Sequence, residues 1–273
     1  MKRYTWRLGL IEISLIALAV VFAFPFYILF TLSLRGAEAT ASPLSLPESL
    51  NFVNYSDAWN KAGLGSAMLN SFLITAISVV LILVFSLLAA YPLARLASRL
   101  SKGMYWLFLF GLLLPFQVAL IPLYQAIRDI GLLGSIWSVI LVYVGLQMPF
   151  SIFLFAGFIR SVPKDYEEAA WVDGASTWMA LRKVVIPLLR PITSTVAILN
   201  TIFIWNDFLT PLLYLTGTER ITIPVALFAF VGQYVSSWPL VFAGLVSAIL
   251  PVLILFFIMQ KSVMKGFAGG LKG

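Results

Sequence analysis

Residues 67–91, AMLNSFLITAISVVLILVFSLLAAY, form an uncharged and almost wholly apolar stretch. The run exceeds the roughly 20 apolar residues that a helix needs to cross the hydrocarbon core of a bilayer. It lacks the strict alternation of a barrel strand, and lipid offers no water to unpaired backbone groups. The stretch therefore predicts a membrane-spanning α-helix.

Five further stretches of this kind predict an all-α integral membrane protein with six transmembrane helices. The composition agrees, because only 11% of the 273 residues are charged, against about 25% in soluble domains. The sequence shows no fixed-period repeat, so we expect one membrane domain over residues 1–273. The predicted spans are about Leu8–Leu34, Ala67–Tyr91, Met104–Tyr124, Ser135–Ile159, Leu188–Leu209 and Leu240–Met259.

The basic residues give the orientation of these spans, because cytoplasmic loops carry an excess of Lys and Arg. Of the 18 Lys and Arg residues, four fall in alternate loops, namely Arg35, Lys61, Arg128 and Arg220, and the other 14 fall on the opposite side. Both termini are therefore predicted to be cytoplasmic. The net charge of +7 is a signal of topology, and nucleic-acid binding is not predicted. A cleaved signal peptide is the alternative for the first span, but its apolar stretch exceeds the roughly 7–15 residues usual there.

The loop at about residues 160–187 is predicted to be cytoplasmic and contains YEEAAWVDG at 166–174 and VVIP at 184–187. Pro163 can open a helix, and Glu167 and Glu168 place negative charge at the positive end of its dipole. Gly174 suits the positive φ at which many helices stop. A helix this short is not stable alone in water, so the loop predicts a docking surface.

The chemistry of this short helix favours a protein partner. Ala169 and Ala170 give it a side that allows close approach, and Glu168 offers a charge to a basic surface. The alternative is an amphipathic connector on the membrane, but such connectors usually carry Lys and Arg on their polar face. Here acidic residues dominate.

The residue types that are absent limit the chemistry. The chain has no Cys and no His, which removes thiolates, imidazole bases and the usual zinc ligands, so no metal site and no catalytic residue is predicted. It also has no Gly-x4-Gly-Lys-Ser/Thr phosphate loop. We expect that the chain is not an enzyme and binds no cofactor of its own.

Polar side chains at membrane depth are costly and tend to face a cavity. Such residues are candidates for a substrate path, and amides with aromatics suit the hydroxyls and apolar faces of neutral sugars. The alternative is that each amide bonds a neighbouring helix, and that Asp207 caps a helix end. The candidates are Gln117, Tyr143, Gln147, Asn200, Asn206 and Asp207.

Several motifs along nearly the whole chain resemble one family. Besides Glu-Ala-Ala, Gly174 and Pro187 at the spacing of an "EAA" coupling loop, they are Asn70-Ser71, the run from Ala89 to Arg95, Leu114-Pro115, Ile121 to Tyr124, Trp205 to Phe208, and the ending from Gln260 to Gly273. The chain resembles the permease subunits of carbohydrate-uptake ABC importers, of the maltose-transporter second-permease type. Val184 and Ile186 stand where Ile and Leu are commoner in that family, and both keep the aliphatic character.

The resemblance implies a permease in the prokaryotic inner membrane that forms half of a path for a sugar or oligosaccharide. It also implies a companion permease, two ATP-binding subunits that hold ATP and Mg, and an extracytoplasmic solute-binding protein. An importer of a non-sugar solute is the main alternative. An ion-coupled secondary transporter is the less favoured alternative, because such a transporter usually needs a carboxylate near the bilayer midplane. The residues implied to couple to the ATPase are Glu167, Glu168, Ala169, Ala170, Asp173, Gly174 and Pro187.

Overall fold

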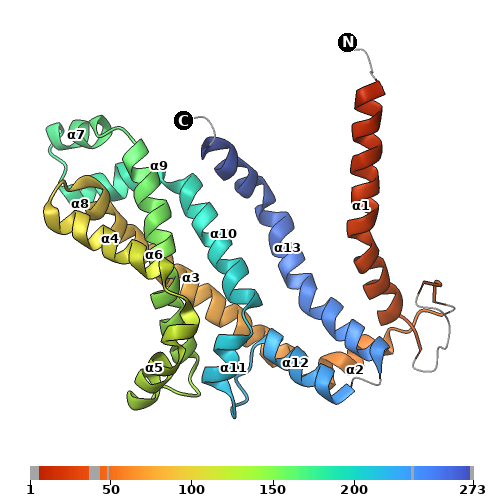
Figure 1. Cartoon of the computed structure of the whole chain (residues 1–273). Coiled ribbons are helices and arrows are strands. Elements are labelled where there is room, and N and C mark those ends of the chain that lie inside the picture. The colour runs from red at the N-terminus through yellow and green to blue at the C-terminus, as the bar shows by residue number, and fades with distance from the viewer. Residues whose placement is uncertain (1–5, 37–43, 48, 235–236, 271–273) are drawn as a thin grey trace. The chain divides into compact units, whose positions relative to one another are not determined.

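The computed structural model describes residues 6–36, 44–47, 49–234 and 237–270 (Figure 1). Every regular element in these ranges is a helix, which confirms the all-α prediction. In chain order they are α1 (Trp6–Ser33), α2 (Val53–Lys61), α3 (Leu64–Arg95), α4 (Arg99–Leu113), α5 (Phe116–Asp129), α6 (Ile136–Ser161), α7 (Asp165–Val172), α8 (Thr177–Ala180), the π-helix η1 (Leu181–Val185), α9 (Ile186–Leu188), α10 (Arg190–Asn206), α11 (Leu209–Leu215), α12 (Ile223–Tyr234) and α13 (Trp238–Gly270).

Three helices in the described ranges are long and apolar enough to cross a membrane alone. They run over Leu8–Ser33, Leu64–Arg95 and Ile136–Ser161. These helices contain, within a few residues at their ends, the first, second and fourth predicted spans. An uninterrupted helix at each of these places is therefore confirmed.

The third predicted span, Met104–Tyr124, is not one helix. The chain breaks between α4 and α5, and the two helix axes differ in direction by 103°. Leu114 is extended, with ψ 121°, because the ring of Pro115 disfavours a helical conformation in the preceding residue. Pro115 then lies just before the first turn of α5, where its missing N–H costs no hydrogen bond.

The fifth predicted span, Leu188–Leu209, corresponds to α10, and its ends differ from the prediction. Residues Thr177–Leu188 and α10 form a second bent pair, with an angle of 72°, and Asp207 ends α10 with an extended ψ of 128°. The sixth predicted span lies within α13. With each bent pair taken as one span, up to five helical spans are present in the described residues. Six crossings with cytoplasmic termini thus stay a prediction.

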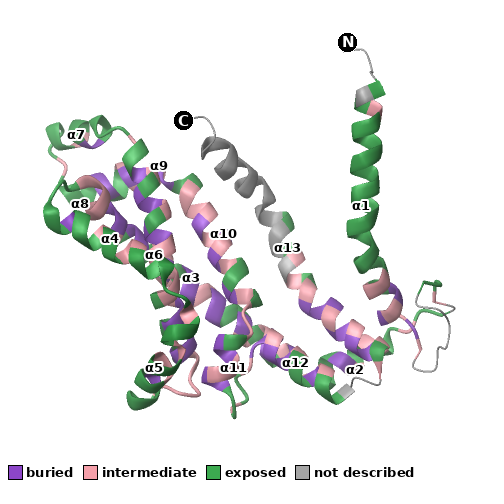
Figure 2. Cartoon of the chain, in the orientation of Figure 1, coloured by how far each residue is buried: buried purple, intermediate pink, exposed green. Residues whose placement is uncertain are grey.

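The chain forms two compact units, Met1–Ala67 with Val225–Ile254 and Met68–Pro224 with Leu255–Gly273. The first unit has a small core of Ala58, Phe230, Leu240 and Ala243. All α1 side chains from residue 10 to residue 27 are exposed (Figure 2). A helix that is apolar on every face needs a lipid or protein surround.

Helix α6 is the centre of the second unit, where it packs against α4, α5, α10 and α11. One cluster of buried side chains includes Ile82, Ile140 and Tyr214. The other includes Tyr91, Phe155 and residues of the segment that follows α7, such as Leu181 and Leu189. This second cluster fixes the ends of α3 and α6 beside that segment and so determines where α7 lies.

Candidate functional site

Helix α7 is the short helix that the sequence predicts between Pro163 and Gly174. It covers Asp165–Val172, with three acidic residues in its first turn. Gly174 has φ +82°, a left-handed conformation that costs glycine little. The N–H groups of Gly174 and Ala175 donate to the carbonyls of Trp171 (3.0 Å) and Ala170 (2.9 Å). This Schellman pair satisfies carbonyls at the end of the helix.

The outer surface of α7 carries both acidic and apolar side chains. Glu168, Ala169 and Asp173 are exposed. Trp171 is 45% exposed and Val172 88%. Because this helix lies outside the predicted spans, an apolar surface of this kind is typical of a contact with another protein.

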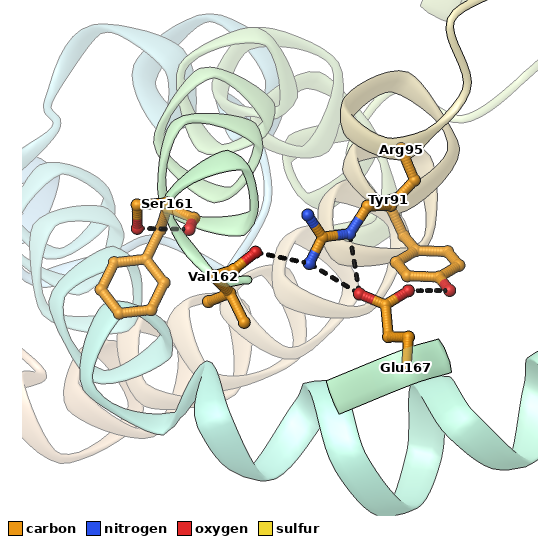
Figure 3. A network of polar contacts seen from close by, with 6 residues as sticks. Tyr91, Arg95, Ser161, Val162 and Glu167 are labelled. Carbon is orange, nitrogen blue, oxygen red and sulfur yellow. Dashed lines mark hydrogen bonds and ion pairs between the residues drawn. The ribbon is translucent and has the colours of Figure 1, made fainter. Parts of the chain in front are cut away.

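Glu167 differs from its neighbour, because it points into the protein and is only 2% exposed. Its Oε2 accepts a hydrogen bond from the Tyr91 hydroxyl at 2.7 Å, and its Oε1 accepts one from Arg95 Nε at 2.7 Å. Arg95 Nη2 lies 2.6 Å from the same Oε1. Figure 3 shows how the two α3 side chains converge on the α7 carboxylate.

Arg95 joins a third element to this network. Its Nη2 donates to the backbone carbonyl of Val162 at 3.1 Å (Figure 3), and Val162 is the residue that ends α6. The guanidinium thus lies at the carboxyl ends of α3 and α6, where the helix dipoles favour a cation. The Glu167 carboxylate lies in the first turn of α7, where the dipole favours an anion. The helix dipoles and the Arg95–Glu167 ion pair therefore both stabilise this arrangement of the ends of α3, α6 and α7.

The segment after α7 completes the loop. The Ser176 hydroxyl accepts a hydrogen bond from Met179 N at 3.3 Å and caps α8. Trp178 is 59% exposed. The predicted coupling residues Ala170 and Pro187 are half-buried, and Gly174 is exposed. The loop residues therefore share one region, but Glu167 faces inward and Glu168 outward.

Sequence reasoning missed Tyr91 and Arg95 as part of this site. Arg95 counted as a basic residue on the cytoplasmic side and Tyr91 as the end of a span, and both belonged to the family-like run from Ala89 to Arg95, but neither was assigned to the loop. The available signal was their spacing, since residues four apart share one helix face. Exposed Trp171 and Trp178 were also missed, although large apolar residues in a loop outside the spans point to a contact surface.

The structure brings together one pair of the six substrate-path candidates among the described residues. The Tyr143 hydroxyl donates to Asp207 Oδ2 at 2.9 Å. The Asp207 carboxylate also accepts from the N–H groups of Leu209 (3.2 Å) and Thr210 (3.3 Å). Asp207 therefore caps α11 and bonds α6, which is the structural role that the sequence left open.

The amides among the candidates show mostly local contacts. Asn200 is 1% exposed, and its Nδ2 donates to Ser151 Oγ on α6 at 3.1 Å and to Val196 O at 2.8 Å. Asn206 Nδ2 donates to Ile202 O within α10 at 2.7 Å. Gln117 is exposed and Gln147 half-buried. A shared substrate path through these residues stays a prediction.

The chain is similar to permeases along most of its length. Residues 82–267 match the family described as "Binding-protein-dependent transport system inner membrane component". The chain is 37% identical over 261 residues to the melibiose/raffinose/stachyose import permease protein MelC of Bacillus subtilis (strain 168), covering 94% of this chain and 95% of the relative. It is 34% identical over 256 residues to the probable starch degradation products transport system permease protein AmyC of Thermoanaerobacterium thermosulfurigenes, covering 93% of each chain.

A solved structure has the same fold. It is a chain of a bacterial ABC transporter involved in the import of the acidic polysaccharide alginate, and it aligns with a TM-score of 0.83. The alignment covers 96% of this chain and 99% of the other, at 24% sequence identity. At that identity the likeness shows the fold alone.

Proposed function

The chain belongs to the family of binding-protein-dependent transport system inner membrane components, and we propose that it is the permease subunit of an ATP-driven importer of a sugar or oligosaccharide. It forms half of the translocation path, and a companion permease forms the other half. Two ATP-binding subunits hold ATP and Mg on the cytoplasmic side, and a solute-binding protein delivers substrate from the other side.

The observation that carries this proposal is the division of the α7 surface. Glu167 faces inward and holds α7 in place, whereas Glu168, Trp171 and Val172 are exposed. A short helix with an acidic group beside apolar side chains fits an apolar cleft that has a basic rim. We assign that cleft to an ATP-binding subunit, because ATP binding must be passed to the permease through a contact of this kind.

The sugar class rests on the relatives. MelC is named for melibiose, raffinose and stachyose, and AmyC for starch degradation products. A third relative, 34% identical over 228 residues, is the diacetylchitobiose uptake system permease protein NgcG of Streptomyces coelicolor. The amide and aromatic side chains on α6 and α10 are of the type that binds sugar hydroxyls and ring faces.

Purification of the tagged chain from its native membrane in mild detergent tests the assembly. Mass spectrometry should find a second permease and an ATP-binding subunit in stoichiometric amounts. Recovery of this chain alone or as a homo-oligomer, under conditions that keep a known ABC importer intact, would contradict the proposal and favour an ion-coupled transporter.

Uptake of radiolabelled raffinose, maltotriose and diacetylchitobiose tests the substrate class. Cells that contain the chain should take up at least one of the three, and a strain without it should lose that uptake. A panel of amino acids is the control. Loss of amino-acid uptake with unchanged uptake of all three sugars would contradict the sugar assignment and leave the importer assignment in place.

A further inference from the structure

The adjacent residues Glu167 and Glu168 have different surroundings on α7 and therefore different roles. Glu168 is exposed and open to a partner, whereas both carboxylate oxygens of Glu167 are already bonded to α3 side chains. We infer that Glu167, Arg95 and Tyr91 tie α7 to α3, so that a displacement of α7 by the ATP-binding subunit moves α3 directly. This inference rests on the proposed function, and it makes these three positioning residues rather than ATPase contacts.

The contact through which α7 would move α3 is separate from the connections that α7 has along the chain. Along the chain, α7 is joined to α6 on one side and to α8 and η1 on the other, and it packs against α8 and η1. The hydrogen bonds that Glu167 accepts instead come from residues 76 and 72 positions earlier in the chain. These hydrogen bonds and the Arg95–Glu167 ion pair join α7 directly to α3.

The tie is strong because it is buried. The side chains of Arg95 and Glu167 are 10% and 2% exposed. A buried charge that loses its partner is left without compensation, which makes separation of the pair unfavourable. Because Arg95 also bonds Val162 at the end of α6, α3, α6 and α7 meet at one guanidinium and move together at that point.

The position of the tie on α3 suits the transfer of motion. Tyr91 and Arg95 lie one turn apart in the last turns of α3, and the same helix carries Ile74 and Ile82 into the other cluster of buried side chains. The helix is continuous from Leu64 to Arg95, across Pro92, so a displacement of Tyr91 and Arg95 is passed along it. A movement of α3 where it carries Ile74 and Ile82 is then linked to α7.

A matched pair of variants in the full importer tests the inference. Glu167→Gln and Glu168→Gln make the same chemical change at neighbouring positions. In Glu167→Gln, we expect the ATP-binding subunit to co-purify at wild-type stoichiometry, while sugar taken up per ATP hydrolysed falls about tenfold, a typical size for coupling between two sites. In Glu168→Gln, we expect weaker co-purification. Loss of the ATP-binding subunit from Glu167→Gln, or wild-type uptake per ATP in that variant, would overturn the inference.

A milder variant tests the same contact if Glu167→Gln does not accumulate in the membrane as a folded chain. Tyr91→Phe removes one hydrogen bond and keeps the ion pair, and we expect uptake per ATP to fall about threefold, the size of an ordinary net hydrogen-bond contribution. Unchanged uptake per ATP in an assembled Tyr91→Phe complex would then count against the tie.

A covalent replacement of the tie distinguishes coupling from stability. The chain has no Cys, so the pair Arg95→Cys with Glu167→Cys can be bridged selectively within it by a short bis-methanethiosulfonate, which joins the two thiols through disulfide bonds and releases methanesulfinate. Bridging should restore uptake per ATP, and reduction should abolish it again. Complete bridging, verified by mass spectrometry, without any recovery would contradict the inference. If instead the wild-type complex contained no ATP-binding subunit, the proposed function itself would fail.

Discussion

Glu168 and Asp165 are both exposed acidic residues in the first turn of α7, but only Glu168 belongs to the Glu-Ala-Ala motif. Reversal of the charge in Glu168→Lys should leave insertion unchanged, because the side chain has no partner within the described part of this chain. We expect association with the ATP-binding subunit to weaken at least about tenfold, since like charges across an interface cost several kcal/mol.

The measurement for Glu168→Lys is co-purification at increasing salt, with sugar uptake in the same cells. Asp165→Lys is the matched control, because it changes the net charge equally in the same turn. Equal losses in the two variants would mean that the overall charge of the loop matters and that Glu168 has no specific contact.

Gly174 ends α7 in a backbone conformation that favours glycine. A Cβ at this position would have no heavy atom within 4 Å, but the backbone has φ +82°. Gly174→Ala should therefore act through strain alone, at about 1–2 kcal/mol, and weaken the end of α7. We expect co-purification of the ATP-binding subunit to fall by up to about tenfold.

Gly157 in α6 is the control for Gly174, since a Cβ there also meets nothing within 4 Å and its backbone is helical. Gly157→Ala should leave association and uptake unchanged. A Gly174→Ala variant that behaves like Gly157→Ala would show that the Schellman turn does not position the docking surface.

At the element scale, Asp207 holds the junction between α10 and α11. Its carboxylate accepts hydrogen bonds from Tyr143, Leu209 and Thr210. Asp207→Asn loses the charge and one acceptor oxygen, and we expect a stability loss of about 1.5–3 kcal/mol, typical for a hydrogen bond to a charged group. The midpoint of thermal unfolding in detergent measures this loss, with the folded fraction at each temperature determined by size-exclusion chromatography.

The same variant separates the capping role from a substrate role. As a cap, Asp207 should affect stability and maximal uptake, with the substrate concentration for half-maximal uptake unchanged. Asp129→Asn is the control, since it makes the same chemical change at an exposed residue outside the six candidates. A large rise in that concentration for Asp207→Asn, at wild-type stability, would instead assign Asp207 to the substrate path.

At the scale of the whole molecule, the bent pair of α4 and α5 decides the number of crossings. Lys102 lies in the first turn of α4 and Asp129 ends α5, and both are exposed. If the pair crosses the membrane as one span, a membrane-impermeant maleimide should label Asp129→Cys in intact cells and Lys102→Cys only after permeabilisation. The absence of native Cys makes each label specific to this chain.

A pair that does not cross would give both cysteines the same accessibility. In that case the six-span topology would be wrong, and the positive-inside assignment of at least one loop would change with it. Thr216→Cys, which is exposed after α11, serves as a reference for the predicted outer side.

The sequence by itself determined the helical class, the uninterrupted helices at the first, second and fourth spans, and the ends of α7. These features depend on interactions over a few residues, namely apolar runs, acidic first turns and a glycine with positive φ. Family membership also followed from local motifs, because motif spacing is a property of the chain. The break at Pro115 was visible as a proline, but its 103° angle was not, since that angle depends on what α4 and α5 pack against.

Only the tertiary structure decided which glutamate faces inward. Glu167 and Glu168 are adjacent and chemically identical, so no local rule separates them. The partners of Glu167 lie 72 and 76 residues earlier in the chain, and Asp207 bonds Tyr143 across 64 residues. Such pairs form because the packing of α3, α6 and the segment after α7 brings distant helix ends together, and buried charges must then find opposite partners.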